Sequence, residues 1–287
     1  MSGARVEVIT RAAGLAEHRG SVFVPTMGAL HAGHAALIAR ARELAGGAGG
    51  AGGGGRVVVS VFVNPTQFNE ARDFELYPRT LERDVEVCGA AGADVVFAPT
   101  VEEMYPGGTG GRWEGELPRV ATAPGLEDAF RPGHFEGVCR VCARLFDVVG
   151  ARAAVFGEKD WQQLAVIRAM VAARGGPEIV GHETVREADG LAMSSRNARL
   201  AVEERGRAAS LFRALTAARG EADAESAERA GRGVLMAEGV EVEYFAVRDA
   251  ATLERFEPGR AGRALVAARV GDVRLIDNLA WPAEGRG

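Results

Sequence analysis

Short apolar runs alternate with segments of helical periodicity over the first two thirds of the chain. From this pattern we expect strands at 21–24, 57–63, 94–98, 153–156 and 178–181 and helices at 34–45, 80–91, 134–149 and 161–173. Continuous apolar strands separated by helices are typical of a parallel sheet that is covered by helices on both faces. The first part of the chain is therefore predicted to be an α/β domain.

After about residue 186 the pattern changes. Two helices rich in Ala, Glu and Arg, at 202–218 and 222–238, precede strands at 240–247, 263–270 and 273–276. Helices followed by a run of strands are typical of a separate, smaller α+β domain. We therefore expect two domains, residues 1–186 and residues 187–287.

The composition limits the partners and the compartment. The 287 residues are 47% hydrophobic and carry a formal net charge of −5, a balance that argues against a broad nucleic-acid-binding face. The N-terminus lacks the apolar core of a signal peptide, and the most apolar stretch is too short for a bilayer, which takes about 20 residues. Three cysteines, an odd number, favour a reducing compartment. We expect a cytoplasmic protein without nucleic-acid or membrane partners.

Two features are similar to binding motifs but have a simpler interpretation. Cys139 and Cys142 form a C-x-x-C inside the segment 134–149, and the sequence offers no second pair for zinc, so we interpret both as core-facing. Residues 46–55 read GGAGGAGGGG. They lack the G-K-[ST] ending of a phosphate-binding loop, and their composition is that of a flexible linker.

The strongest chemical motif lies between the first strand and the first helix, where residues 25–34 read PTMGALHAGH. His31 and His34 are three residues apart at a helix start, so both rings can face one side of the turn. Free N–H groups and the positive end of the helix attract phosphate there, and Gly28 and Gly33 allow a ligand close to the backbone. The H-x-G-H pattern at such a turn indicates adenylyl or nucleotidyl transfer, in which imidazole donors act on the phosphates.

Three further polar segments carry candidate chemistry: two follow predicted strands, and the third is a loop at the domain junction. Residues 157–160 read GEKD and contain Lys159, the only lysine among 34 basic residues; its compact ammonium suits an ATP phosphate. Residues 193–197 read MSSRN, whose hydroxyls and guanidinium can wrap a triphosphate. Residues 64–68 read NPTQF, and amide side chains at the end of a sheet can bind a small acid. In an open α/β sheet, such turns lie at the edge where ligands bind.

With these motifs the chain resembles the pantothenate synthetase family from end to end. The motifs that carry the resemblance are PTMGALHxGH at 25–34, NPxQF at 64–68, YPRT at 77–80, RPGHF at 131–135, GEKDxQQ at 157–163, VRExDGLAMSSRN at 185–197 and RLIDN at 274–278. The resemblance implies a Rossmann-like nucleotidyltransferase domain that binds ATP and pantoate, a C-terminal lid domain and a homodimer. It also implies ATP-dependent condensation of (R)-pantoate with β-alanine through a pantoyl-adenylate, with Mg²⁺, AMP and pyrophosphate.

The same resemblance assigns the site residues by motif. The catalytic residues are His31, His34, Lys159 and Arg196, with His34 as proton donor. Gln67 and Gln163 hold pantoate, and Gln67 also lies at the β-alanine position. The ATP-binding set is Met27, Gly28, Ala29, Leu30, His31, Ala32, Gly33, His34, Gly157, Glu158, Lys159, Asp160, Val185, Met193, Ser194, Ser195 and Arg196.

This sequence departs from the family pattern in three places. Ala32 occupies a position that is often acidic, but the resemblance implies that only its neighbours reach ATP. The glycine tract at 46–55 lengthens a loop away from the motifs. Asp84 is expected to hold Mg²⁺ through water, but Arg83 stands before it where many relatives have a second acid, which weakens that expectation.

Three other functions stay compatible with parts of this pattern. H-x-G-H alone permits a cytidylyl- or adenylyltransferase whose product keeps the nucleotide, although the amide pair Gln67 and Gln163 argues against it. A relic of an aminoacyl-tRNA synthetase would bind RNA, against which the acidic charge counts. A catalytically inactive ATP-binding regulator would not need His31, His34, Lys159 and Arg196 together. The acid that drives ATP–pyrophosphate exchange separates these functions.

Overall fold

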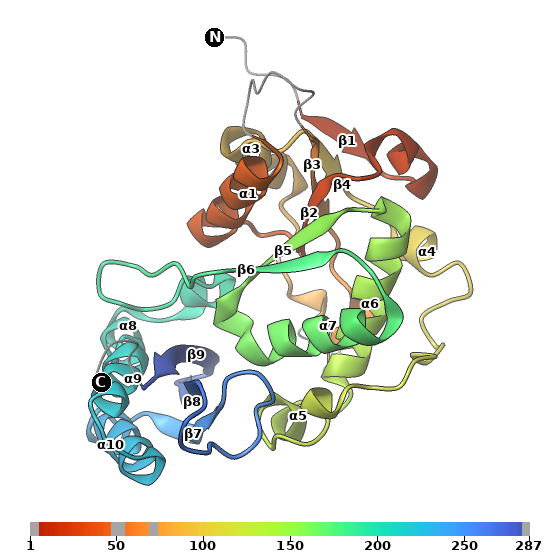
Figure 1. Cartoon of the computed structure of the whole chain (residues 1–287). Coiled ribbons are helices and arrows are strands. Elements are labelled where there is room, and N and C mark those ends of the chain that lie inside the picture. The colour runs from red at the N-terminus through yellow and green to blue at the C-terminus, as the bar shows by residue number, and fades with distance from the viewer. Residues whose placement is uncertain (1–5, 47–54, 69–73, 283–287) are drawn as a thin grey trace. The chain divides into compact units, whose positions relative to one another are not determined.

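A computed structural model of the chain describes residues 6–46, 55–68 and 74–282 (Figure 1). The chain forms two compact units. The first comprises residues 1–158 and 166–183, and the second comprises residues 159–165 and 184–287. The segment 159–165, which contains Lys159, is thus grouped with the C-terminal part of the chain.

The first unit is built on a six-stranded parallel sheet, as the apolar runs predicted. In spatial order its strands are β1 (Glu7–Ile9), β4 (Val95–Phe97), β3 (Val57–Val61), β2 (Val22–Thr26), β5 (Ala153–Gly157) and β6 (Glu178–His182). The central strands are buried on both faces, which explains why their sequences are continuously apolar rather than alternating. The short edge strand β1 was missed by the sequence analysis because three residues carry too little pattern.

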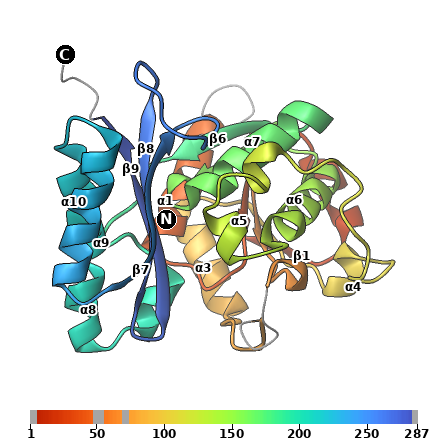
Figure 2. The ribbon, with the colours of Figure 1, turned by 90° about the horizontal axis from the view of Figure 1, so that it is seen from below.

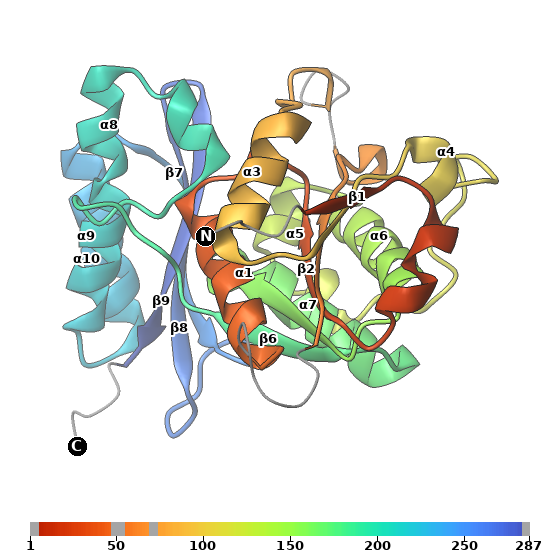
Figure 3. The same ribbon diagram turned by 90° about the horizontal axis from the view of Figure 1, so that it is seen from above.

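Helices cover both faces of this sheet. The helical elements of the first unit are η1 (Ala12–His18), α1 (Ala32–Leu44), η2 (Pro65–Gln67), α3 (Leu81–Ala91), α4 (Val101–Met104), η3 (Arg119–Ala121), α5 (Glu127–Phe130) and α6 (His134–Val149). After β5 the chain continues through η4 (Glu158–Asp160) and α7 (Trp161–Arg174), which include the segment 159–165 of the second unit. Figures 2 and 3 show α1 and α3 on one face of the sheet and α6 on the other. The bounds of α6 are those that the sequence predicted, and Cys139 and Cys142 face its buried side, as expected.

The strand order reverses beside β2. From β2 the chain builds outward through β3 and β4 on one side, and through β5 and β6 on the other. In open α/β sheets the ligand-binding crevice lies at the carboxyl ends of the two strands that flank this reversal. Here those ends lead into the turns at 27–31 and 157–158, which carry two of the predicted ATP motifs.

The second unit is a three-stranded antiparallel sheet with helices packed on one face (Figures 2 and 3). Its elements are η5 (Ser195–Arg199), α8 (Val202–Ala208), α9 (Ser210–Arg219), α10 (Ala224–Ala237), β7 (Glu241–Asp249), β8 (Gly262–Val270) and β9 (Val273–Trp281). Phe245 of β7, Leu215 of α9 and Leu235 of α10 are fully buried in the core between these layers. This is the α+β unit that the second half of the sequence predicted.

Two predicted elements in this unit were wrong in extent. The single helix expected at 202–218 is two helices that meet at Ala209, where the hydroxyl of Ser210 donates to the carbonyl of Arg207 at 2.6 Å. The strand expected to end at residue 276 continues to Trp281, because the polar pair Asp277 and Asn278 is buried and paired with β8. The interpretation of residues 46–55 as a linker concerns residues that, except for Gly46 and Gly55, lie outside the described part of the chain.

Candidate active site

The turn from β2 into α1 has a backbone that only a few residue types adopt without strain. Gly28 has φ +84°, and Ala29 has φ +51°, a left-handed conformation that is uncommon outside glycine. The hydroxyl of Thr26 donates to the carbonyl of Ser60 on β3 and accepts from the N–H of Gly28 at 3.2 Å. A Cβ at position 28 would lie 2.9 Å from a carboxylate oxygen of Asp84. Glycine is therefore favoured at position 28 both by the left-handed backbone and by the close approach of Asp84.

Asp84 of α3 holds the same turn through its carboxylate. Its Oδ2 accepts from the N–H of Ala29 at 3.1 Å and from the hydroxyl of Thr80 at 3.2 Å, and its Oδ1 accepts from the N–H of Leu30 at 2.8 Å. The side chain is fully buried. A buried carboxylate is stabilised by such hydrogen bonds, and in return it fixes the backbone that supplies them.

The two histidines of H-x-G-H form a reciprocal cap at the start of α1. Nδ1 of His31 accepts from the N–H of Gly33 at 3.1 Å, and Nδ1 of His34 accepts from the N–H of His31 at 3.3 Å. The ring centroids are 4.1 Å apart. Because each Nδ1 accepts a hydrogen bond, the neutral rings carry their proton on Nε2. Both rings thus lie at the positive end of the helix, which suits an anionic phosphate.

Gln67 is tied to the ATP motif and to its own strand end. Its Nε2 lies 3.0 Å from Sδ of Met27, and its Oε1 accepts from Nδ2 of Asn64 at 3.1 Å. Nδ1 of His134 lies 2.9 Å from the carbonyl oxygen of Gln67. A Cβ at Gly137 would collide with the carbonyl oxygen of Thr66, so glycine lets α6 approach this segment closely. The RPGHF motif therefore supports the position of Gln67.

Asn64 contacts Gln67 directly, a supporting position that the sequence analysis did not assign. It is 1% exposed; its Oδ1 accepts from the hydroxyl of Tyr105 at 2.8 Å, and its Nδ2 donates to the carbonyl of Gly137 at 3.2 Å. Its position at the end of an apolar strand, inside the NPxQF motif, was the signal in the sequence. Asn64 holds Gln67 at a fixed place on the sheet edge.

In the second unit, Lys159 lies in a short segment that is anchored at several points. Its Nζ is 3.8 Å from Oδ1 of Asp160, and its carbonyl accepts from Nδ2 of Asn278 at 2.8 Å. Trp161 donates from Nε1 to the carbonyl of Ala250 at 2.9 Å, and the guanidinium of Arg263 lies 3.5 Å over its ring. The backbone of Lys159 is thus fixed by side chains that are distant in sequence.

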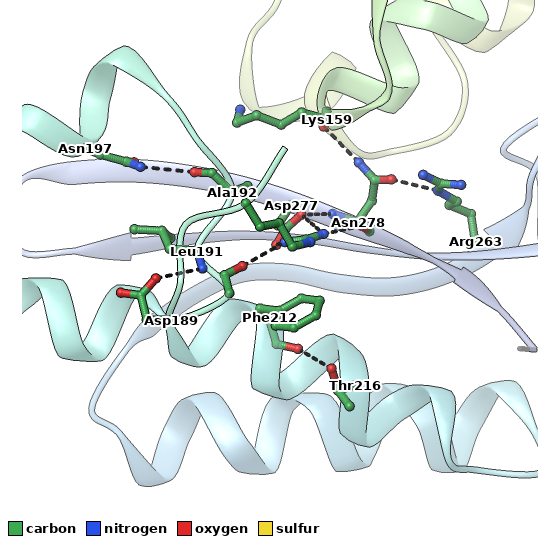
Figure 4. Close-up of polar contacts among 12 residues, drawn as sticks. Lys159, Asp189, Leu191, Ala192, Asn197, Phe212, Thr216, Arg263, Asp277 and Asn278 are labelled. Atoms are coloured by element: carbon green, nitrogen blue, oxygen red, sulfur yellow. Dashed lines mark hydrogen bonds and ion pairs between the residues drawn. The ribbon is translucent and has the colours of Figure 1, made fainter. Parts of the chain in front are cut away.

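The segment at 185–197 is a narrow hairpin followed by a single turn of helix. Met193 donates its N–H to the carbonyl of Val185 at 2.9 Å, and Ser194 caps η5 by accepting from the N–H of Arg196 at 3.2 Å. Asn197 donates to the carbonyl of Ala192 at 3.0 Å, a contact visible in Figure 4, and to Oε1 of Glu187 at 3.2 Å. The MSSRN motif is therefore a built turn that presents the hydroxyl and guanidinium groups expected to meet phosphate.

The predicted site residues divide between the two units. The first unit contains the ATP motif Met27–His34 together with Gln67, Asp84, Gly157 and Glu158. The second unit contains Lys159, Asp160, Gln163, Val185 and the segment Met193–Arg196. Within the first unit the structure brings Met27 and Gln67 into contact and connects Asp84 to the histidine turn. That the two sets together bind one ATP stays a prediction.

These features define a class of protein. A parallel sheet with a reversal of strand order, and an H-x-G-H cap at the carboxyl end of the strand beside that reversal, is the architecture of a Rossmann-like nucleotidyltransferase domain. The family model described as "Pantoate-beta-alanine ligase" matches residues 4–280. The chain belongs to the pantoate-beta-alanine ligase family, which confirms the resemblance and the function inferred from its motifs.

Individual relatives agree with this assignment. The chain is 54% identical to pantothenate synthetase of Rubrobacter xylanophilus over 276 residues, covering 91% of this chain and 90% of the relative. The crystal structure of pantothenate synthetase from Thermus thermophilus is 45% identical, covers 96% of this chain and 99% of the other, and gives a TM-score of 0.85. The ligase from Francisella tularensis, complexed with β,γ-ATP and β-alanine, is 29% identical, with coverages of 96% and 97% and a TM-score of 0.74. The chain is therefore an enzyme of the ligase class.

Two kinds of feature do not occur in the part of the chain that the structure describes. The described residues include no group of three or more His, Cys, Asp or Glu side chains placed to hold a metal ion. Across the same ranges, no helix combines the length and apolar character needed to cross a membrane.

Proposed function

We propose that the chain binds ATP at the H-x-G-H turn and uses it to activate pantoate as an adenylate, which then reacts with β-alanine. A carboxylate oxygen of pantoate bonds to the α-phosphorus while the bond to the pyrophosphate oxygen breaks. The amine of β-alanine then attacks the carbonyl, AMP leaves with the carboxylate oxygen, and the amine loses a proton. The reciprocal histidine cap carries this proposal, because it places both imidazole rings at the N-terminus of α1, where phosphates bind.

The ATP-binding set is proposed as it was assigned by motif. Residues Met27–His34, Gly157–Asp160, Val185 and Met193–Arg196 would surround the nucleotide. His34 is proposed as the proton donor, His31 as a second donor, and Lys159 and Arg196 as the cations that receive the leaving pyrophosphate. Support comes from the reciprocal hydrogen bonds of the two histidines and from the serine cap that shapes the Met193–Arg196 turn.

Gln67 and Gln163 are proposed to bind pantoate, and Gln67 is also proposed to bind β-alanine. The contact between Gln67 and Met27 supports this assignment, because it places an amide next to the ATP motif. The complex of the Francisella tularensis relative with β,γ-ATP and β-alanine is consistent with both ligands using one fold.

The residues near the ATP motif are compatible with Mg²⁺ if most of its ligands are phosphate oxygens and water. In such sites Mg²⁺ keeps several waters and takes one or two carboxylates, so the small number of acidic groups near the turn is no obstacle. Asp84 would hold it through water, using lone pairs of oxygens that also accept from Ala29 and Leu30. When bound, the ion would offset the negative charge of the triphosphate.

Residues 1–186 are proposed as the ATP- and pantoate-binding domain and residues 187–287 as the lid, with 159–165 held by the lid unit. We further propose a homodimer in the cytoplasm, on the basis of the family and of the sequence. Sedimentation or light scattering checks the assembly.

Isotope exchange between pyrophosphate and ATP tests the proposed function. Exchange is expected to need pantoate and Mg²⁺ but not β-alanine, because the adenylate forms before the amine is used. Exchange that appears only with β-alanine present excludes the stepwise mechanism. Exchange driven by a phosphorylated alcohol instead of pantoate would indicate a nucleotide-retaining transferase.

A further inference from the structure

The neighbouring residues Asp277 and Asn278 of β9 each hold one segment of the proposed ATP site in the second unit. Both side chains are nearly fully buried, at 3% and 2% exposure. Consecutive residues of a strand point to opposite faces of the sheet. Two consecutive residues can therefore hold one segment on each face of the sheet.

Asn278 forms a hydrogen bond to the segment that contains Lys159. Its Nδ2 donates to the carbonyl oxygen of Lys159 at 2.8 Å, and its Oδ1 accepts from Nε of Arg263 at 2.7 Å. Figure 4 shows the amide of Asn278 between Lys159 and Arg263, with the Lys159 side chain extending away from this contact. The hydrogen bond to Arg263 fixes which end of the amide faces Lys159.

Asp277 forms an ion pair with the hairpin that leads to the MSSRN turn. Its carboxylate pairs bidentately with Arg186, at 2.6 Å to Nη1 and 3.0 Å to Nη2. Arg186 also donates to the carbonyl of Gly190 at 3.0 Å and lies 4.2 Å over the ring of Phe212. Because Arg186 faces Ala192 across the hairpin, its position sets that of the following Met193–Arg196 turn.

We propose that Asp277 and Asn278 are positioning residues, which hold Lys159 and the Met193–Arg196 turn at a fixed spacing for the triphosphate. This inference rests on the proposed function, in which both segments bind ATP. A misplacement of about an ångström at a reacting group can cost on the order of a hundredfold in rate. In this proposal the polar residues of β9 set the geometry of the site segments that they contact.

A double-mutant cycle tests whether Asn278 acts by positioning Lys159. Asn278→Asp keeps an acceptor for Arg263 but sets a carboxylate against the Lys159 carbonyl in place of a donor. We expect it to lower pantoate-dependent exchange by about tenfold to a hundredfold in the wild-type background. In a Lys159→Ala background it should lower the remaining exchange by less than about threefold, since there is no ammonium left to position. Equal losses in both backgrounds would show a general structural effect and overturn the proposal.

A matched control lies on the same strand. Trp281 is buried and donates from Nε1 to the carbonyl of Ala218 at 2.8 Å, away from both segments. Trp281→Phe is expected to lower the thermal midpoint but to leave exchange within about twofold at a temperature where the variant is folded. If Asn278→Asp does not fold, Asn278→Ser replaces it in the cycle, because a serine hydroxyl is too short to span the same distance and introduces no charge.

A second readout separates this inference from the proposed function. ATP binding is measured by calorimetry for wild type, Asn278→Asp, Lys159→Ala and the double variant. Weaker binding caused by Asn278→Asp only when Lys159 is present supports the inference, even in a protein that shows no pantoate-dependent exchange. Lack of such exchange in wild type defeats the proposed function alone. Identical weakening with and without Lys159 defeats the inference alone.

A second double-mutant cycle, with Arg196, tests whether Asp277 acts by positioning the Met193–Arg196 turn. Asp277→Asn and Arg196→Ala are combined, and their joint loss of exchange is expected to be smaller than the product of the single losses. A joint loss equal to that product would mean that Asp277 does not act through the Met193–Arg196 turn.

Discussion

The carboxylate of Asp84 accepts a 2.8 Å hydrogen bond from the backbone N–H of Leu30, fifty-four residues earlier in the chain. The same carboxylate accepts from Ala29, whose backbone is left-handed at φ +51°. Such a conformation persists where the surroundings determine it. The buried carboxylate on α3 thus supports the strained turn that precedes the two histidines.

Asp84→Asn is expected to lower adenylate formation by about tenfold to a hundredfold, because the amide cannot accept from both N–H groups and the turn shifts. Adding Ala29→Gly should restore part of the rate, since glycine adopts a left-handed backbone without strain. The measurement is single-turnover formation of pantoyl-adenylate. If raising Mg²⁺ restores the rate and Ala29→Gly does not, Asp84 acts mainly through the metal.

Gln67→Ala should raise the KM for pantoate, because it removes a partially buried partner for a polar group of the substrate. The expected cost is about 1–3 kcal/mol in apparent binding, with the KM for ATP nearly unchanged. Steady-state kinetics with each substrate varied checks this. An unchanged KM for pantoate with weakened ATP binding would move Gln67 from the acid pocket to the nucleotide site.

Lys159→Arg is expected to fold normally but to lose adenylation nearly as badly as Lys159→Ala. An ammonium is compact, whereas a guanidinium is a wide planar fork that displaces neighbouring groups. The backbone of Lys159 is held by Asn278 and cannot easily move to make room. The reverse exchange at an exposed position, Arg40→Lys, is the matched control and should leave activity unchanged. Near-normal activity of the arginine variant would show that charge alone matters at position 159.

The three cysteines are expected to resist alkylation in the native protein. Burial raises the pKa of Cys88 and of Cys139 to about 12, and it also raises the pKa of Cys142. The reactive form is the thiolate, so at pH 8 only about one thiol in ten thousand is reactive at a pKa of 12. Reactivity therefore increases as pH rises toward that pKa. Mass spectrometry after iodoacetamide should show no adduct in the native protein and three adducts in guanidinium. Rapid native labelling at pH 8 would contradict the burial of these side chains.

The sequence by itself determined five of the six strands of the parallel sheet, most of its helices and the candidate chemistry. Buried parallel strands are continuously apolar, and α6 has one apolar face with a turn-forming glycine at each end, so local patterns located them. The H-x-G-H motif was equally legible, because both capping bonds join residues within three positions of each other. Local hydrogen bonds and periodicity involve residues that are close in sequence, so they can be predicted from the sequence.

Only the tertiary structure decided how the site residues are held. Asp84 meets the β2–α1 turn, Asn278 meets Lys159 and Arg186 meets Asp277 across 54, 119 and 91 positions. A buried polar residue in such a contact is indistinguishable, along the chain, from one that faces solvent. Its partner is brought close by the packing of whole elements, so neither periodicity nor spacing can identify it. The strand β9 shows the consequence, since the predicted strand ended at residue 276 and the polar residues Asp277 and Asn278 beyond it contact both site segments.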